Sequence, residues 1–125
     1  MKSGPLSTSQ KLPSLQLRYF SDLPFTALWG AKYLPISRHI SEFYEDAAAG
    51  TLPQVSFVEP RFFGESLGIS NDDHPFADIR NGQAFLNQVY EAVTSSPNWA
   101  NTVMVINYDE RTELSLGSPM RIYPD

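Results

Sequence analysis

The chain has 125 residues, of which 42% are hydrophobic, enough for one domain with a packed core. The net charge of -5 excludes a nucleic acid or an anionic membrane held by electrostatics, because both partners need a basic surface. The absence of cysteine excludes disulfides and thiolate metal sites, which leaves oxygen and imidazole ligands for any metal.

The first half of the chain predicts a short strand and a helix. Residues 1–14 are rich in Ser, Pro and Gly and are expected to be a flexible lead-in. Apolar residues alternate over 15–19, which predicts a strand. A loop follows over 21–35, and the apolar spacing over 37–49 then predicts a helix that stops at Gly50.

The second half predicts two buried strands around a helix. The runs VSFV at 55–58 and VMVI at 103–106 are apolar without alternation, as in strands covered on both faces. Between them, residues 78–95 carry apolar side chains at helical spacing, with Asp78 as N-cap. Strand, helix and strand in this order predict a parallel βαβ unit and an α/β fold.

Two clusters of candidate site residues follow the predicted strands. The loop 60–77 contains NDDHP at 71–75, and the pair Asp109 and Glu110 follows the run 103–106. Sites in parallel sheets lie at the carboxyl ends of the strands, so we expect the two clusters to converge. Carboxylates with the imidazole of His74 suit a divalent metal or phosphate chemistry. A solvated turn or a helix cap is the alternative interpretation of such acidic residues.

Four further polar residues are also candidates. His39 is expected on the polar face of a helix, with no catalytic role. Glu59, at a strand end, is expected to hydrogen-bond the loop that follows it. Asp72 and Asp73 suit either a metal or a local turn cap.

The blocks at residues 21–62, 71–93 and 95–110, with their spacing, resemble the phosphoesterase family of bacterial phospholipases C and acid phosphatases, a branch of the alkaline phosphatase superfamily. The resemblance implies a portion of a three-layer α/β sandwich. It also implies that Asp109 and Glu110 are ligands of a divalent metal ion of unknown identity, and that His74 lines the phosphate site. The implied substrate is a phospholipid or a simpler phosphate ester.

The chain also departs from the family pattern. Family members usually continue after Asp-Glu with a Gly-Gly segment ending in Asp-His, whereas residues 111–125 here read RTELSLGSPMRIYPD. The early Glu-Asn metal ligands and the Ser or Thr nucleophile of the family are not found. We therefore expect a partial phosphoesterase domain at 15–110, followed by a tail that departs from the family, and no activity for the chain alone. A non-catalytic remnant or binding module is the alternative.

The sequence indicates neither a cellular localisation nor an oligomeric state. Residues 1–13 contain no apolar run of signal-peptide length, and no stretch approaches the about 20 apolar residues of a membrane span. Intact members of the family are often exported, so the localisation of this chain stays open.

Overall fold

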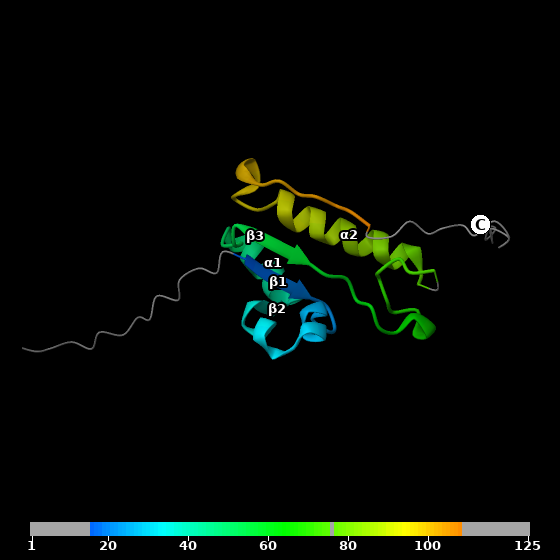
Figure 1. Cartoon of the computed structure of the whole chain (residues 1–125). Helices are drawn as coiled ribbons and strands as arrows, with labels where there is room; N and C mark the ends of the chain where they lie inside the picture. The colour runs from blue at the N-terminus through cyan, green and yellow to red at the C-terminus, as the bar shows by residue number, and fades with distance from the viewer. Residues whose placement is uncertain (1–15, 76, 109–125) are drawn as a thin grey trace, which may run out of the picture.

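A computed structural model describes residues 16–75 and 77–108, and it contains a three-stranded parallel sheet. The central strand is β1 (Gln16–Phe20), flanked by β2 (Ser37–His39) on one side and β3 (Val55–Val58) on the other (Figure 1). All pairings are parallel, with Arg18 opposite both Ser37 and Phe57. The predicted α/β class with parallel strands is therefore confirmed.

Helix α1 (Ile40–Ala49) connects β2 to β3, and it is shorter than predicted. The helix is capped at its N-terminus by His39, whose Nδ1 accepts a hydrogen bond from the backbone N–H of Ser41 at 3.3 Å. It ends at Gly50, where a φ of 69° favours glycine. The predicted helical start at Ser37 is wrong, because residues 37–39 pair with the central strand instead.

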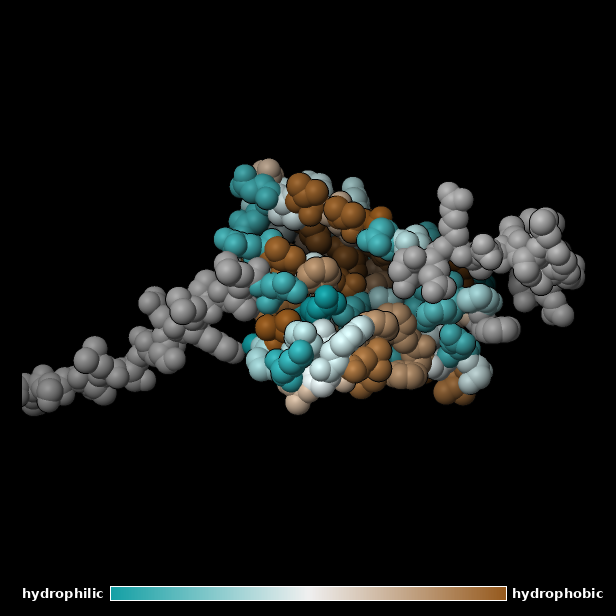
Figure 2. All heavy atoms as spheres, viewed as in Figure 1, coloured by the Kyte–Doolittle hydropathy of each residue, from teal (hydrophilic) through white to brown (hydrophobic). Residues whose placement is uncertain are grey.

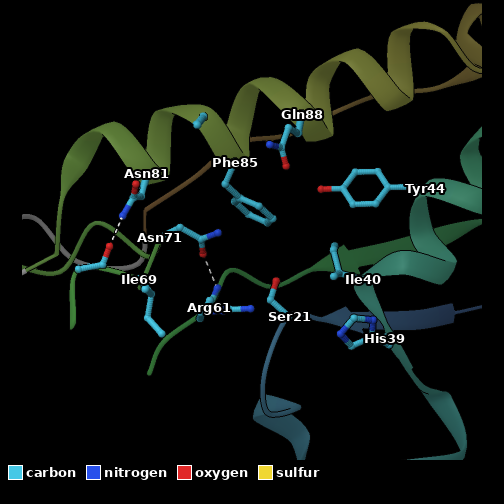
Figure 3. Close-up of a pocket in the computed structure, with 12 residues that line it drawn as sticks. Ser21, His39, Ile40, Tyr44, Arg61, Ile69, Asn71, Asn81, Phe85 and Gln88 are labelled. Atoms are coloured by element: carbon cyan, nitrogen blue, oxygen red, sulfur yellow. Dashed lines mark hydrogen bonds between the residues drawn. The ribbon is translucent and has the colours of Figure 1, made fainter. Parts of the chain in front are cut away.

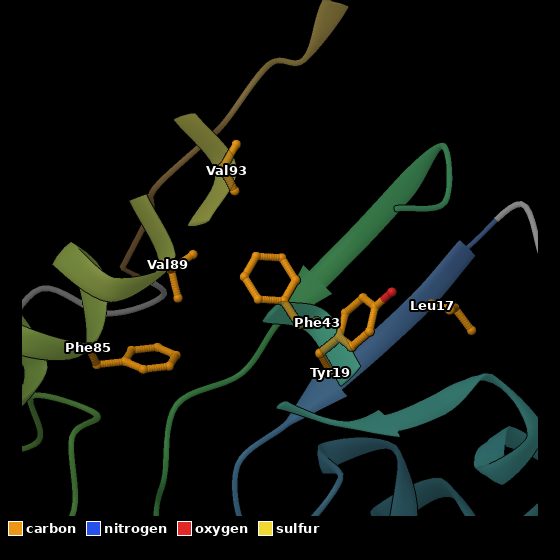
Figure 4. Close-up of a cluster of buried hydrophobic side chains, with 6 residues drawn as sticks. All are labelled: Leu17, Tyr19, Phe43, Phe85, Val89 and Val93. Atoms are coloured by element: carbon orange, nitrogen blue, oxygen red, sulfur yellow. The ribbon is translucent and has the colours of Figure 1, made fainter. Parts of the chain in front are cut away.

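Helix α2 (Ile79–Thr94) follows a long loop and agrees with the predicted helix over 78–95. The carboxylate of Asp78 accepts from the backbone N–H of Arg80 at 3.0 Å, which caps the first turn as expected. One face of the helix is buried, with Phe85, Val89 and Val93 pointing toward α1 and the sheet (Figure 4).

The core lies between one face of the sheet and the two α-helices. Its buried members come from β1, α1 and α2: Leu17, Tyr19, Phe43, Phe85, Val89 and Val93 (Figure 4). The rings of Tyr19 and Phe43 meet edge to face, with centroids 5.4 Å apart. The buried Tyr19 hydroxyl donates to Oδ2 of Asp46 at 2.7 Å, so its polar end has a partner.

The prediction of a strand at residues 103–106 is wrong. The segment is extended and runs beside α2 (Figure 1), and within the described part of the chain only β1 pairs with β3. Met104 packs against the core, whereas Val103 and Val105 are 87% and 77% exposed. The run is thus covered on one side only, by a helix, and the predicted βαβ unit from 55–58 to 103–106 is not formed. The parallel sheet is built from β1, β2 and β3 instead.

The surface near this segment is partly apolar. Figure 2 shows hydrophobic side chains between α2 and the sheet, among polar ones on the same face. Neither helix among residues 16–75 and 77–108 has the length and apolar character needed to cross a membrane.

Candidate functional site

The loop between β3 and α2 has a fixed course because it is hydrogen-bonded at several points. The backbone N–H of Asn71 donates to the carbonyl of Arg61 at 3.0 Å, and the side-chain oxygen of Asn71 accepts from the backbone N–H of Arg61. Asn81, in the first turn of α2, donates to the carbonyls of Gly68 and Ser70 at 2.8 and 3.2 Å. The loop is therefore attached both to itself and to the start of α2.

His74 lies in this loop beside two carboxylates. Its Nδ1 is hydrogen-bonded to Oδ2 of Asp72, whose side chain is only 1% exposed, whereas the His74 side chain is 57% exposed. The ring of Phe62 stands edge-on to the imidazole, with centroids 6.5 Å apart. A buried carboxylate thus holds one nitrogen of an imidazole that faces the surface.

Glu65 joins this pair to form a group with metal-ligand chemistry. One ligand atom each from Glu65, Asp72 and His74 all lie within 4.8 Å of one another. The other oxygen of Asp72, Oδ1, is buried and has no hydrogen-bond partner among residues 16–75 and 77–108. A buried carboxylate oxygen without a donor is costly, and a cation would offset that cost. Two carboxylates and an imidazole fit a divalent ion.

Asp73 connects the loop to two other parts of the chain. Its φ of 60° lies in the left-handed region, and its carboxylate lies so close to Gly82 of α2 that a Cβ at Gly82 would collide with it. Oδ2 of Asp73 accepts from the hydroxyl of Tyr108 at 3.1 Å. This hydrogen bond raises the pKa of the Tyr108 phenol.

Asp109 and Glu110, the predicted metal ligands, lie outside the described residues. The hydrogen bond from Tyr108 to Asp73 nevertheless brings the residue directly before Asp109 to the loop that holds His74. The roles of His74, Asp109 and Glu110 stay predictions.

Glu59 has a structural task. It is buried, forms an ion pair with Arg18 at 3.2 Å and accepts from the backbone N–H of Phe25 at 2.9 Å. Its carbonyl accepts from the hydroxyl of Ser21 at 2.9 Å. These contacts fix the turn after β1 against the end of β3. Glu59 thus hydrogen-bonds a loop as predicted, although it is the loop after β1.

A pocket of about 470 Å³ lies between α2 and the carboxyl ends of the strands (Figure 3). Ser21 follows β1, His39 ends β2, and Arg61 follows β3 by three residues. Sequence reasoning missed this pocket and also Glu65. The sequence indicates these residues only through their position, because Glu65 and several pocket residues lie in segments that follow predicted strands.

Fold and loop together define an α/β protein whose candidate site lies at the carboxyl ends of parallel strands. A sequence model of the Phosphoesterase family matches residues 17–113. The chain belongs to this family, which confirms the family predicted from the sequence blocks.

Curated relatives are phospholipases C from a plant and from bacteria. The chain is 41% identical over 97 residues to non-specific phospholipase C6 of Arabidopsis thaliana, an alignment covering 74% of this chain and 19% of the relative. It is 38% identical over 99 residues to non-specific phospholipase C1 of the same plant, with 74% and 18% covered. For hemolytic phospholipase C of Pseudomonas aeruginosa the identity is 35% over 96 residues, with 74% and 12% covered. The chain thus spans less than a fifth of the length of each relative.

Proposed function

We propose that this chain contributes part of the active site of a metal-dependent phosphoric-ester hydrolase of the phospholipase C and acid phosphatase type. The supporting observation is the hydrogen bond between Tyr108 and Asp73, in a chain whose family match runs over both segments. It joins the loop of His74 to the residue before Asp109. In this proposal, His74 and the pair Asp109 and Glu110 belong to one site although they lie far apart in the sequence.

In this proposal His74 contacts the phosphate or the leaving oxygen, and Asp72 orients it. The buried carboxylate of Asp72 engages Nδ1 and so fixes the orientation of the His74 ring. An imidazole held in this way can donate a hydrogen bond or a proton to an oxygen on which charge develops. Asp72 is therefore a positioning residue and His74 a catalytic one.

Asp109 and Glu110 are proposed to hold a divalent metal ion, with Glu65 and Asp72 as further oxygen donors nearby. The buried Oδ1 of Asp72, which has no hydrogen-bond partner in the described part of the chain, supports a cation in this region. Such an ion, when bound, polarises a phosphoryl oxygen and offsets its negative charge. The carboxylates of the chain supply the oxygen ligands that a hard cation prefers.

The names of the relatives favour a phospholipid over a simple phosphomonoester as the substrate. The resemblance implies a Ser or Thr nucleophile supplied by residues other than these 125. Loss of a nucleophile typically removes several orders of magnitude of rate, so the chain alone is expected to be inactive. The alternative is a non-catalytic remnant or binding module with the same fold.

The test is a chimera in which residues 17–113 replace the matching segment of the Arabidopsis phospholipase C6. Hydrolysis of a short-chain phosphocholine lipid and of an aryl phosphate is measured beside the isolated chain. We expect turnover by the chimera and none by the chain. In the chimera, Asp109→Asn or Glu110→Gln should abolish turnover, and His74→Ala should reduce it by about 10²-fold or more.

The matched control is Glu45→Gln, an exposed carboxylate on α1, which should leave the rate unchanged. Wild-type rates in the Asp109→Asn chimera would contradict the proposed site. A folded chimera without activity would favour the non-catalytic alternative, and turnover by the isolated chain would contradict its expected inactivity.

A further inference from the structure

The pocket beneath α2 is distinct in its charge. Twelve of the described residues line it, and none of these twelve is an Asp or Glu, although the chain has 14 acidic and 9 basic residues. Among the same twelve, Arg61 is the one Lys or Arg. An acidic chain therefore has an open pocket whose described lining carries a positive charge from Arg61 and no carboxylate, and such a pocket attracts anions.

The guanidinium of Arg61 is available for a ligand. Three other arginines in the described part of the chain, Arg18, Arg38 and Arg80, each form an ion pair with a carboxylate. The side chain of Arg61 is half-buried and makes no hydrogen bond or ion pair with another described residue; only its backbone N–H is used, by Asn71. A guanidinium in such a place is well suited to a phosphate, which it can bind through two parallel hydrogen bonds.

Two more donors remain open at the pocket. His39 uses Nδ1 to accept from Ser41, so the proton of the neutral ring lies on Nε2. Asn71 uses its oxygen to accept from Arg61, which leaves its Nδ2 as a donor (Figure 3). Both side chains line the pocket, where a nitrogen donor would suit an anion.

The remaining walls are largely apolar. Tyr44 and Ile40 come from α1, Phe85 from α2 and Ile69 from the loop (Figure 3). A cavity of about 470 Å³ exceeds the size of a bare phosphate ion and has room for a small organic group attached to it. Apolar walls around a cationic end suit an ester better than an inorganic ion.

We propose that this pocket, the Arg61 pocket, binds the phosphate group of a small phosphate ester, with Arg61 on the phosphate oxygens and the apolar walls around the organic part. Anion binding follows from the pocket alone. The choice of an ester as the organic class rests on the proposed function. The same phosphate can belong to a soluble ester or to a lipid headgroup, and the experiment separates these two sources.

The experiment follows backbone NMR signals of the ¹⁵N-labelled 125-residue chain. It is titrated separately with inorganic phosphate, glycerol 3-phosphate, dihexanoyl phosphatidylcholine below its micelle concentration, and choline. We expect saturable shifts at residues 39, 61, 71 and 85, with at least one ester binding tighter than inorganic phosphate. Binding should weaken as ionic strength rises.

Substitutions of Arg61 test whether phosphate compounds bind in this pocket. Arg61→Gln should weaken ester binding at least about tenfold, because a charge-assisted, two-point contact is lost. Arg61→Lys keeps the positive charge but lacks the planar guanidinium, so its affinity for the ester should lie between those of the wild type and Arg61→Gln. Arg80→Gln, at an exposed arginine paired with Asp78, is the matched control and should leave affinity unchanged. Unchanged signals at Tyr19 and Phe43 verify the fold of each variant.

Binding of glycerol 3-phosphate supports a soluble ester as the source, and binding of the lipid alone supports a headgroup. The proposal is overturned if no phosphate compound binds, if Arg61→Gln binds as the wild type does, or if choline binds tighter than the phosphate compounds. These results are independent of turnover in the chimera. A failed pocket therefore leaves the proposed function standing, and an inactive chimera leaves anion binding at Arg61 standing.

Discussion

Two regions of this molecule are stabilised in different ways. The core region, made of the sheet, α1 and the inner face of α2, is held by apolar contacts shared among many side chains. The site region, made of the loop residues 60–75 and the extended segment 102–108, is held by individual polar contacts such as Tyr108 to Asp73 and Asn81 to Gly68. We expect the structure of the core region to depend on the pattern of apolar residues as a whole. The structure of the site region should depend on individual hydrogen bonds.

The largest effect should come from the core region. Phe43 is 1% exposed and packs against both Tyr19 and Tyr44, so Phe43→Ala should lower the free energy of unfolding by about 3–5 kcal/mol. This loss is a large fraction of the about 5–15 kcal/mol by which a native domain is stable. Phe63→Ala, at a ring that is 61% exposed, is the control and should cost far less. Equal losses in urea unfolding would contradict the division into two regions.

Gly82→Ala tests the site region through the sign of its effect. Alanine in a helix is favoured over glycine by about 1 kcal/mol, so propensity alone predicts a gain. The new Cβ would collide with the carboxylate of Asp73, so we expect a net loss of about 1–3 kcal/mol and loss of the Tyr108 contact. Because propensity predicts a gain in stability and the collision predicts a loss, thermal unfolding of the variant distinguishes the two.

The control for this change removes the obstacle. In an Asp73→Gly background the carboxylate is absent, and glycine accepts the φ of 60° at this position. Gly82→Ala should then stabilise the chain, as helix propensity predicts. A loss of the same size in both backgrounds would show that Asp73 is not the cause.

Tyr19→Phe should have the smallest effect, and that effect depends on pH. Burial, and then the hydrogen bond to Asp46, raises the pKa of Tyr19 above its ordinary 10.0. The folded chain therefore keeps a proton that the unfolded chain loses, so stability is full below pH 10 and declines above it. At pH 8 the variant should lose about 1 kcal/mol for the missing hydrogen bond. Between pH 8 and pH 11 it should lose less stability than the wild type does in urea unfolding.

The contrast between the regions also explains which features could be predicted from the sequence. The spacing of Phe85, Val89 and Val93 and the cap at Asp78 predict α2 almost to its ends, because many residues repeat the same signal. The predicted start of α1 at residue 37 is too early, because apolar spacing does not mark the first residue of a helix and residues 37–39 pair with β1.

The run 103–106 was misassigned for a related reason. An apolar stretch without alternation does not say whether a strand or a helix will cover it, and here the stretch runs beside α2 with Met104 packed against the core (Figure 1). In the site region, the placement of His74 beside Asp72 follows from a turn with one left-handed residue, which no periodicity reports. The motif NDDHP predicts the loop as a candidate site, but the hydrogen-bond partners of its side chains depend on the three-dimensional structure.

The most direct measurement of the central claim, one site shared by the loop of His74 and the pair Asp109 and Glu110, is a titration of the ¹⁵N-labelled chain with Mn²⁺. The account predicts that signals of residues 72–74 and 108–110 broaden together at the lowest Mn²⁺ concentrations. It also predicts that Asp109→Asn raises the concentration needed for both groups. Independent broadening of the two groups, or unchanged broadening of residues 72–74 in Asp109→Asn, would contradict it.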